Sequence, residues 1–272
     1  MTEPMRAWRM GSYYATQLHY PELRRVYEAG GPELPPYRGL ATLWDAHSAN
    51  RLPDYADYLA FLAREKSSPL DAVLDLACGT GWLTARLTTV AAEAVGVDRS
   101  PEMLAVANER YGRYEGVSFH AGDFRDFTLG RRFDAAVCAS NSLNYVEGRS
   151  DLARVFVAVA RHLKPGGVFL FDTVTEAGMR HLSGQFYHAQ VGERRFALRL
   201  NFDAKQLRER SQAILPEGVE THCRVPIGLA DVRAAAAGTG MTVTDTFSNV
   251  LAAWHPWPSV IAFFVLTRDD TP

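Results

Sequence analysis

The chain has 272 residues, of which 47% are hydrophobic and 22% are charged, so it is a globular protein long enough to bury a sizeable core. Its 29 Lys and Arg residues nearly balance 31 Asp and Glu residues, and the net charge of -2 argues against nucleic acid as a partner, which normally requires a clustered basic surface. The three cysteines have no CxxC spacing and predict neither a disulfide framework nor a metal site.

No apolar stretch approaches the ~18 residues that a membrane span requires. The first nine residues also lack the apolar core of a signal peptide. We therefore expect a cytoplasmic protein with no membrane partner.

Residues 1–70 predict a mainly helical N-terminal lid segment. Residues 55–64 have the spacing of an amphipathic helix. The breaks at residues 30–32 and 35–36, rich in glycine and proline, indicate turns ahead of that helix. A single domain is expected to follow over residues 71–272.

From Ala72 onward, short apolar runs alternate with amphipathic stretches, a pattern typical of βαβ units and a mostly parallel sheet. Ser100 followed by Pro101 has the chemistry of a helix start, an N-cap and a proline in the first turn. The expected strands are residues 73–76, 94–98, 117–119, 133–138 and 168–172, with helices over 82–89, 101–111 and 150–163.

Residues 175–227 differ in character and predict a β-rich insertion over the edge of the sheet. Residues 194–200 and 220–225 have the pattern of antiparallel strands, and a polar stretch over residues 205–210 and a turn at residues 216–218 lie between them. A helix over residues 229–237 and strands over residues 242–247 and 260–266 are expected to complete the main sheet.

The loop from Asp75 to Gly81 follows the first expected strand, and Asp98 ends the second. In an open α/β sheet, ligands bind outside the carboxyl ends of such strands. Gly79 and Gly81 let a ligand approach the backbone closely, Asp98 can accept hydrogens from ribose hydroxyls, and Asp75 fits a water-mediated or loop-ordering acceptor. The loop is neither G-x-G-x-x-G nor a P-loop, which disfavours phosphate. The alternative is a tight turn beside an exposed acid.

Four segments occur in order: VLDLACGTG at residues 73–81, VDRSPEML at 97–104, GDF at 122–124 and LKPGG at 163–167. Together they resemble the successive motifs of class I S-adenosylmethionine (SAM)-dependent methyltransferases. Residues 50–55 and 140–145 resemble the glycine N-methyltransferase and amino-sugar N-methyltransferase group. The resemblance implies a Rossmann-like, seven-stranded, mostly parallel sheet with helices on both faces. It also implies SAM as cofactor, S-adenosyl-L-homocysteine as product, and methyl transfer to a small-molecule acceptor.

The resemblance further implies a cofactor site built from these motifs and the N-terminal segment. Ala77 and the two glycines would contact the methionine part of SAM, Asp98 would hold the ribose, and Arg99 and Met103 would border the adenine. The residues of this predicted site are Tyr37, Trp44, Arg51, Asp75, Ala77, Gly79, Gly81, Asp98, Arg99, Met103, Asp123, Phe124 and Ser140.

Several members of this site have a structural alternative. Asp123 would accept a hydrogen bond from the adenine amino group, and Phe124 would donate one from its backbone N–H. Asp123 could instead cap the following turn. Arg51 would pair with the SAM carboxylate or be a solvated arginine before a helix. Tyr37 and Trp44 would close over the ligand or be core aromatics.

Tyr145, Asn141 and His222 are the candidate catalytic residues. By resemblance, Tyr145 takes the place of a histidine in the glycine-methylating enzymes, where its hydroxyl could orient the nucleophile. Asn141 and Ser140 offer oxygens to an attacking amine, and the alternative for Tyr145 is a ring buried under the insertion. No His-Asp or acidic pair at telling spacing is visible, which favours an amine acceptor, because a phenol or alcohol needs a base nearby.

The expected activity is N-methylation of a small molecule in specialised metabolism. Glycine is not the predicted acceptor, because no arginine in the insertion matches one that binds a substrate carboxylate. O- or C-methylation, a nucleic-acid or protein methyltransferase, and a SAM-binding protein without transferase activity remain as alternatives. Residues 254–258, WHPWP, predict part of the acceptor pocket or a subunit contact in a homodimer.

Overall fold

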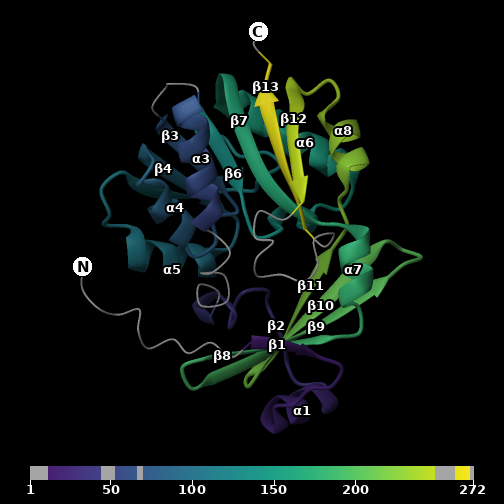
Figure 1. The fold of residues 1–272 in the computed structure, drawn as a ribbon. Coiled ribbons are helices and arrows are strands. Elements are labelled where there is room, and N and C mark those ends of the chain that lie inside the picture. The colour runs from purple at the N-terminus through teal and green to yellow at the C-terminus, as the bar shows by residue number, and fades with distance from the viewer. Residues whose placement is uncertain (1–11, 44–52, 66–69, 249–260, 270–272) are drawn as a thin grey trace.

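The computed structural model describes residues 12–43, 53–65, 70–248 and 261–269, which form two β-sheets with helices around them (Figure 1). One sheet has seven strands and carries the motif segments. The other has six strands and combines the insertion with the N-terminal segment. None of the helices in the described part of the chain has the length and apolar character of a membrane span.

The seven-stranded sheet confirms the predicted mostly parallel arrangement. Its order is β12-β13-β7-β6-β3-β4-β5, and only β13 runs antiparallel to its neighbours. The order steps outward from β3 in both directions, so the topological switch point lies between β3 and β6. The strands are β3 (Leu70–Leu76), β4 (Ala91–Asp98), β5 (Val117–Ala121), β6 (Phe133–Cys138), β7 (Leu163–Val174), β12 (Met241–Ser248) and β13 (Ile261–Arg268).

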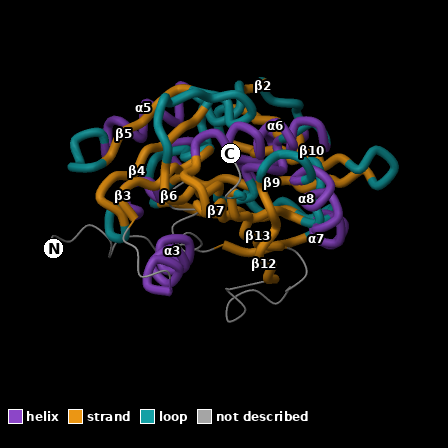
Figure 2. Tube along the Cα trace, turned by 90° about the horizontal axis from the view of Figure 1, so that it is seen from above, coloured by secondary structure: helices purple, strands orange, loops and turns teal. Residues whose placement is uncertain are grey.

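Helices cover both faces of this sheet, because its central strands bury apolar side chains on both sides. Figure 2 shows α3 and α6 on opposite sides of the strands. Phe156 of α6 packs with Phe169 and Phe171 on one face, and Leu59 of α3 packs with Val73 on the other. The helices are α3 (Pro53–Glu65), α4 (Trp82–Leu87), α5 (Pro101–Tyr111), α6 (Arg149–His162) and α8 (Leu229–Ala236).

Helix α5 begins where the sequence predicts. The Ser100 side chain accepts a hydrogen bond from the Met103 N–H at 3.2 Å, and Pro101 occupies the first turn, where no N–H is needed. The cap fixes the start of α5 directly after Asp98, at the carboxyl end of β4.

The six-stranded sheet contains more of the insertion than the sequence predicts. Four of its strands lie between residues 186 and 224, rather than two, and β10 covers part of the stretch expected to connect them. The inner positions of β10 include Glu209 and Ser211, so its polar–apolar alternation is weak. The order is β1-β8-β9-β10-β11-β2, with β1 (Ser12–Ala15), β8 (Phe186–Val191), β9 (Arg194–Asp203), β10 (Arg208–Leu215), β11 (Gly218–Arg224) and β2 (Glu33–Leu34).

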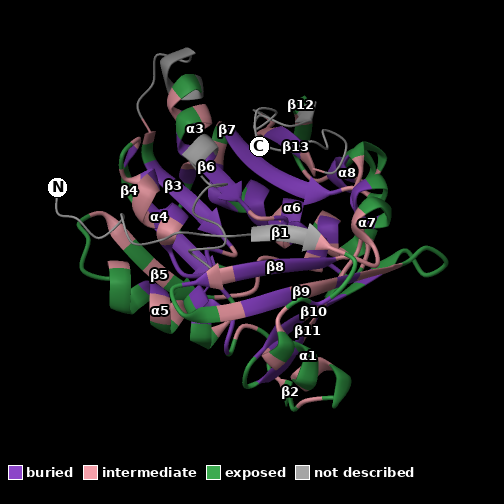
Figure 3. Cartoon of the chain, turned by 60° about the horizontal axis from the view of Figure 1, so that its bottom comes forward, coloured by how far each residue is buried: buried purple, intermediate pink, exposed green. Residues whose placement is uncertain are grey.

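The N-terminal segment is helical only in part. Helix α1 (Pro21–Glu28) buries Leu23 against the insertion's sheet, but β1 pairs with β8 and β2 pairs with β11. The segment thus supplies both edges of that sheet, which the expectation of a mainly helical segment did not include. Figure 3 shows burial along β7 of the large sheet and along β8 and β9 of the small one.

Asn144 joins the two sheets. It lies in the 3-10 turn η2 (Ser142–Tyr145), and its amide donates to the carbonyls of Val174 at 2.9 Å and Val225 at 2.7 Å. Its Oδ1 accepts from the Val174 N–H at 2.9 Å, and its own carbonyl accepts from the Val225 N–H at 2.8 Å. The end of β7, the loop after β6 and the end of β11 therefore meet at this buried side chain, beside helix α7 (Glu176–Leu182).

Candidate functional site

A cavity of about 340 Å³ lies at the carboxyl ends of β3 and β4. The loops after these strands form one wall, and the N-terminal segment and η2 form the other. It is lined by Pro35, Pro36, Tyr37, Ala77, Gly79, Asp98, Arg99, Ser100, Glu102, Met103, Gly122, Phe124, Ser142 and Tyr145. A hollow of about 30 Å³ shares Ala77, Gly79 and Ser142 with it and adds Asp75 and Ser140. Most of the predicted site residues therefore meet here.

The glycine loop is shaped by its backbone. Gly79 has φ 55° and Ala77 has φ 53°, both in the left-handed region that favours glycine. Gly81 also has a positive φ, of 79°, but it does not line the cavity. A Cβ at Gly81 would lie 2.5 Å from the Phe119 ring. Gly81 is therefore required for packing against β5, and Gly79 is the glycine that borders the cavity.

Strained backbone gathers around this cavity. Besides Ala77, the residues Tyr37, Ser140 and Asn141 have φ between 58° and 66°, although none of them is glycine. Such conformations cost of order 1–3 kcal/mol each and are common at binding sites, where the surrounding structure holds them. Tyr37 and Ala77 line the main cavity, and Ser140 lines the hollow.

Asp98 holds the glycine loop against α5. Its Oδ2 accepts from the Gly79 N–H and its Oδ1 from the Ser100 N–H, both at 2.8 Å. Burial raises the pKa of Asp98, although the backbone N–H groups of Ser100 and Gly79 oppose that effect. With 9% of its surface exposed, the carboxylate sits in the cavity wall, where it can accept a hydrogen bond from a ligand hydroxyl.

Asp75 lies deeper than Asp98, with 1% of its surface exposed. Its Oδ2 accepts from the Thr84 hydroxyl at 2.6 Å, which ties the end of β3 to α4. Burial raises its pKa to about 7. The contact with Thr84 supports the loop-ordering role among those predicted for Asp75.

Tyr37, Tyr145 and His222 come together at the far wall of the cavity. The Tyr145 hydroxyl lies 3.2 Å from His222 Nδ1, and the Tyr37 and His222 rings are 4.8 Å apart. Burial raises the pKa of both tyrosines. Two of the three predicted catalytic residues are thus in direct contact, and Tyr145 also lines the cavity.

Glu220 is a member of this group that the sequence did not single out. It is fully buried, and its Oε2 lies 3.5 Å from His222 Nε2. Its carboxylate also accepts from the N–H groups of Tyr37 at 2.9 Å, Gly39 at 2.6 Å and Leu40 at 3.0 Å. The spacing of two between Glu220 and His222 on a strand was the available signal, since it places both on one face. The sequence shows no His-Asp or acidic pair at telling spacing, and the pair that the structure brings together is a histidine with a glutamate.

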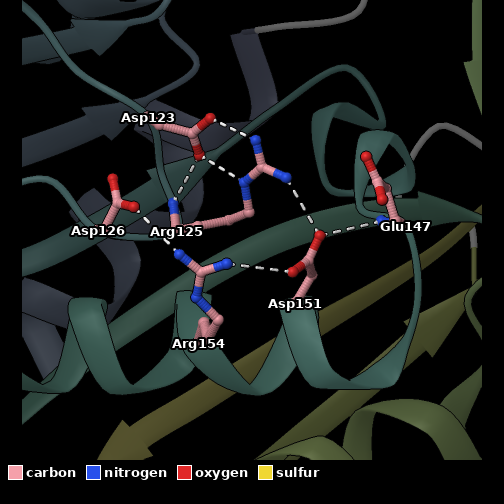
Figure 4. Close-up of polar contacts among 6 residues, drawn as sticks. All are labelled: Asp123, Arg125, Asp126, Glu147, Asp151 and Arg154. Carbon is pink, nitrogen blue, oxygen red and sulfur yellow. Dashed lines mark hydrogen bonds and ion pairs between the residues drawn. The ribbon is translucent and has the colours of Figure 1, made fainter.

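Asp123 is not among the residues that line the cavity, and its carboxylate turns toward Arg125 (Figure 4). Arg125 donates to its carboxylate from Nη2 at 2.6 Å, from Nε at 2.8 Å and from the backbone N–H at 3.0 Å. The bond from the backbone N–H is the contact expected for the turn-capping alternative, and the Arg125 contacts hold the pKa of Asp123 below its usual range. Arg125 also binds Asp151 at 3.1 Å, which links this loop to α6. Phe124, the neighbour of Asp123, does line the cavity.

Asn141 lies behind the wall rather than in it. Its N–H donates to Asp172 Oδ2 at 2.9 Å, and Asp172 also accepts from the Tyr55 hydroxyl of α3. Its side chain is 8% exposed, and Asn141 Oδ1 has no hydrogen-bond partner among the residues that the structure describes. Trp44 and Arg51, which the sequence also placed in the site, lie outside the described residues.

Comparisons with known proteins agree with this geometry. Residues 73–167 match the family model described as a methyltransferase domain. The chain is 33% identical over 135 residues to dTDP-3-amino-3,4,6-trideoxy-alpha-D-glucopyranose N,N-dimethyltransferase of Streptomyces venezuelae, which covers 48% of this chain and 56% of the relative. It is 34% identical over 145 residues to dTDP-3-amino-3,6-dideoxy-alpha-D-glucopyranose N,N-dimethyltransferase of Streptomyces fradiae, covering 52% and 56%. The chain thus spans about half the length of the curated relatives it matches.

Solved structures extend the likeness to most of the chain. The sugar N-methyltransferase KedS8 from Streptoalloteichus is 29% identical, with a TM-score of 0.65, over 83% of this chain and 92% of that one. A SAM-dependent methyltransferase from Clostridium acetobutylicum has a TM-score of 0.72 at 22% identity, over 86% and 99%. Residues 73–167 therefore form a methyltransferase domain, and the chain has the fold of the class I SAM-dependent methyltransferases and resembles the amino-sugar N-methyltransferases among them.

Proposed function

We propose that the protein transfers a methyl group from SAM to an amine on a small molecule, and that an amino sugar is the favoured acceptor class. The observation that carries this proposal is the cavity in which Gly79, Asp98 and Tyr145 meet at the carboxyl ends of the parallel strands. The names of the amino-sugar relatives supply the acceptor class.

The residues around the cavity suit SAM. Its volume of about 340 Å³ lies within the range of about 300–1,000 Å³ that is typical of small-molecule sites. Gly79, Asp98, Met103 and Phe124 all line the cavity. Gly79 would expose backbone to the ligand, Asp98 would accept from a ribose, and Met103 and Phe124 would offer apolar contact to an adenine. Tyr37 and the two prolines before it would cover the ligand from the N-terminal segment.

The sulfonium of SAM supplies a methyl group that is already activated, so the protein's task is alignment and exclusion of water. Alignment of two reactants can contribute roughly 7–11 kcal/mol to lowering the barrier. In this proposal Tyr145 orients the acceptor through its hydroxyl, with His222 behind it. Asn141, behind the wall, would position the loop after β6 rather than touch the acceptor.

Other parts of the chain take roles that follow from this site. Residues 1–70 would act as the cover of a methyltransferase domain over residues 71–272, and the insertion at residues 175–227 would shape the acceptor side. Because β1 and β2 belong to the insertion's sheet, cover and acceptor side would move as one unit.

O-methylation is the second candidate, and the pairing of His222 with Glu220 favours it, because a phenol needs a base. Incubation with SAM and a panel of dTDP-amino sugars, simple amines and phenols separates the two by mass spectrometry. A gain of one methyl on an amino sugar is expected. Methylation of phenols alone would establish the second candidate, and SAM binding without any methylated product would leave a binding protein.

A further inference from the structure

We propose that Glu220 is a positioning residue that stabilises protonated His222, and that His222 is the base for the acceptor. The Tyr145 hydroxyl carries the proton from the acceptor to His222. This rests on the proposed function and adds to it a path for the proton that an amine must lose. The path consists of the acceptor nitrogen, the Tyr145 hydroxyl, His222 Nδ1 and, on the other side of the ring, Glu220.

The geometry fits proton transfer in one direction, from the cavity through Tyr145 to His222. Tyr145 lines the cavity, whereas His222 is 5% exposed and lies behind it. The Tyr145 hydroxyl lies 3.2 Å from His222 Nδ1. On the far side of the ring, His222 Nε2 lies 3.5 Å from Glu220 Oε2 and is a buried nitrogen with no hydrogen-bond partner within the described ranges. A proton arriving at Nδ1 would therefore create a cation beside a carboxylate.

Glu220 is held in place independently of His222. Three backbone N–H groups, of Tyr37, Gly39 and Leu40, donate to its carboxylate. Burial raises the pKa of Glu220, but the nearby His222 ring and the three backbone donors outweigh burial and hold this pKa below its usual range. The carboxylate thus stays ionised at neutral pH and can stabilise a protonated His222.

The proton balance is simple. An acceptor amine enters as an ammonium group and cannot attack until its lone pair is free. It gives one proton to the Tyr145 oxygen while the Tyr145 proton passes to His222 Nδ1, so the hydroxyl is restored and His222 becomes an imidazolium. The neutral amine then forms the N–C bond as the C–S bond of the sulfonium breaks, and His222 later releases its proton to solvent.

Glu220 is the acid that pairs with His222, because the neighbouring charged groups pair with each other. Arg224, the next inward position on β11, donates to Glu209 of β10 at 2.7 Å, so these two charges neutralise each other. The titratable groups in contact with the His222 ring are Glu220, Tyr37 and Tyr145, and the charges of Arg224 and Glu209 act on Tyr145.

The test is Glu220→Gln, which keeps the shape and removes the charge, assayed with dTDP-3-amino-3,6-dideoxyglucose as acceptor. At about pH 7 we expect kcat to fall about tenfold or more, because His222 becomes a weaker base. At roughly pH 9.5 the difference should largely disappear, since more of the amine arrives already neutral. Glu217→Gln, an exposed glutamate of the same hairpin, is the matched control and should retain full activity at both pH values.

A loss by the same factor at every pH would overturn the proposal, because it is the sign of a purely structural role. His222→Gln, which leaves the three backbone donors of Glu220 in place, should show the same pH-dependent loss and covers the case in which Glu220→Gln fails to fold. An equal loss of activity by His222→Gln across the pH range would also overturn it.

A measurement without turnover separates this proposal from the proposed function. The imidazole signals of the full chain are titrated by NMR with S-adenosyl-L-homocysteine bound, and His222 is assigned from the signal missing in His222→Gln. Glu220→Gln should move the midpoint of that titration to lower pH, and an unchanged midpoint would refute the role of Glu220. Failure of the wild type to methylate any amine would refute the proposed function instead.

Discussion

At the scale of single residues, two acids with similar sequence contexts have different roles. Asp98 and Asp123 each follow a parallel strand, and the resemblance places both in the cofactor site. Asp98 lines the cavity and binds the Gly79 N–H, whereas Asp123 turns outward to Arg125. A long cationic side chain two residues away decides the orientation of Asp123, and the strand pattern does not reveal it.

Asp98→Ala should therefore weaken SAM binding strongly, and Asp123→Ala should not. The first change removes charge-assisted hydrogen bonds of about 1.5–3 kcal/mol each, while the second removes contacts that lie outside the cavity. Calorimetry with SAM measures both. Equal affinities of the folded Asp98→Ala protein and the wild type would contradict the assignment of the cavity.

Asp75 should make the protein less stable as pH rises from about 4 to about 7. Its pKa is raised from 3.8 to about 7 by burial, so in that window the folded state binds more protons than the unfolded state, and the free energy of unfolding falls with pH. The shift corresponds to an upper limit of roughly 4 kcal/mol. Urea unfolding of the wild type and Asp75→Asn across this window tests the effect, and parallel pH profiles of the two proteins would disprove it.

At the scale of elements, the loop after β6 is fixed by tertiary contacts. Asn144 uses both ends of its amide to bind the backbone of β7 and the residue after β11, and no local signal in residues 140–145 specifies those partners. This arrangement holds Tyr145, the next residue, at the cavity wall.

Asn144→Ala should destabilise the protein by about 2–4 kcal/mol, because it removes three side-chain hydrogen bonds to the buried or partly buried backbone of Val174 and Val225. Asn108→Ala is the matched control, since that side chain makes a single exposed hydrogen bond within α5. The free energy of unfolding from urea titration compares the two. A change of similar, small size in both variants would mean that Asn144 does not join the sheets as described.

At the scale of the whole molecule, the N-terminal segment and the insertion share one sheet that faces the cofactor cavity. Residues 35–37 line that cavity, and residues 37–40 are bound by Glu220 of β11. Binding of a ligand in the cavity should therefore change the stability of backbone hydrogen bonds across the small sheet.

Hydrogen exchange over residues 35–43 should slow when SAM is added, because the segment would be held between the ligand and Glu220. Mass spectrometry of peptides from this segment gives the rates, and peptides from α8, which lies outside the cavity and packs on α6 and β12, serve as the internal control. Equal exchange with and without a saturating concentration of SAM would remove the role of this segment as a cover.

The seven-stranded sheet, the capped start of α5 and the glycine loop beside Asp98 could all be predicted from the amino-acid pattern. These features depend on apolar periodicity, helix caps and motifs within a few residues of one another, so they can be read locally. The packing of the whole chain was needed to see that β1 and β2 join the insertion, that Asn144 joins the two sheets and that Glu220 stands behind His222. Glu220 binds Tyr37 across 183 positions of the chain, and contacts at such separation are set by how the sheets pack, which no local pattern encodes.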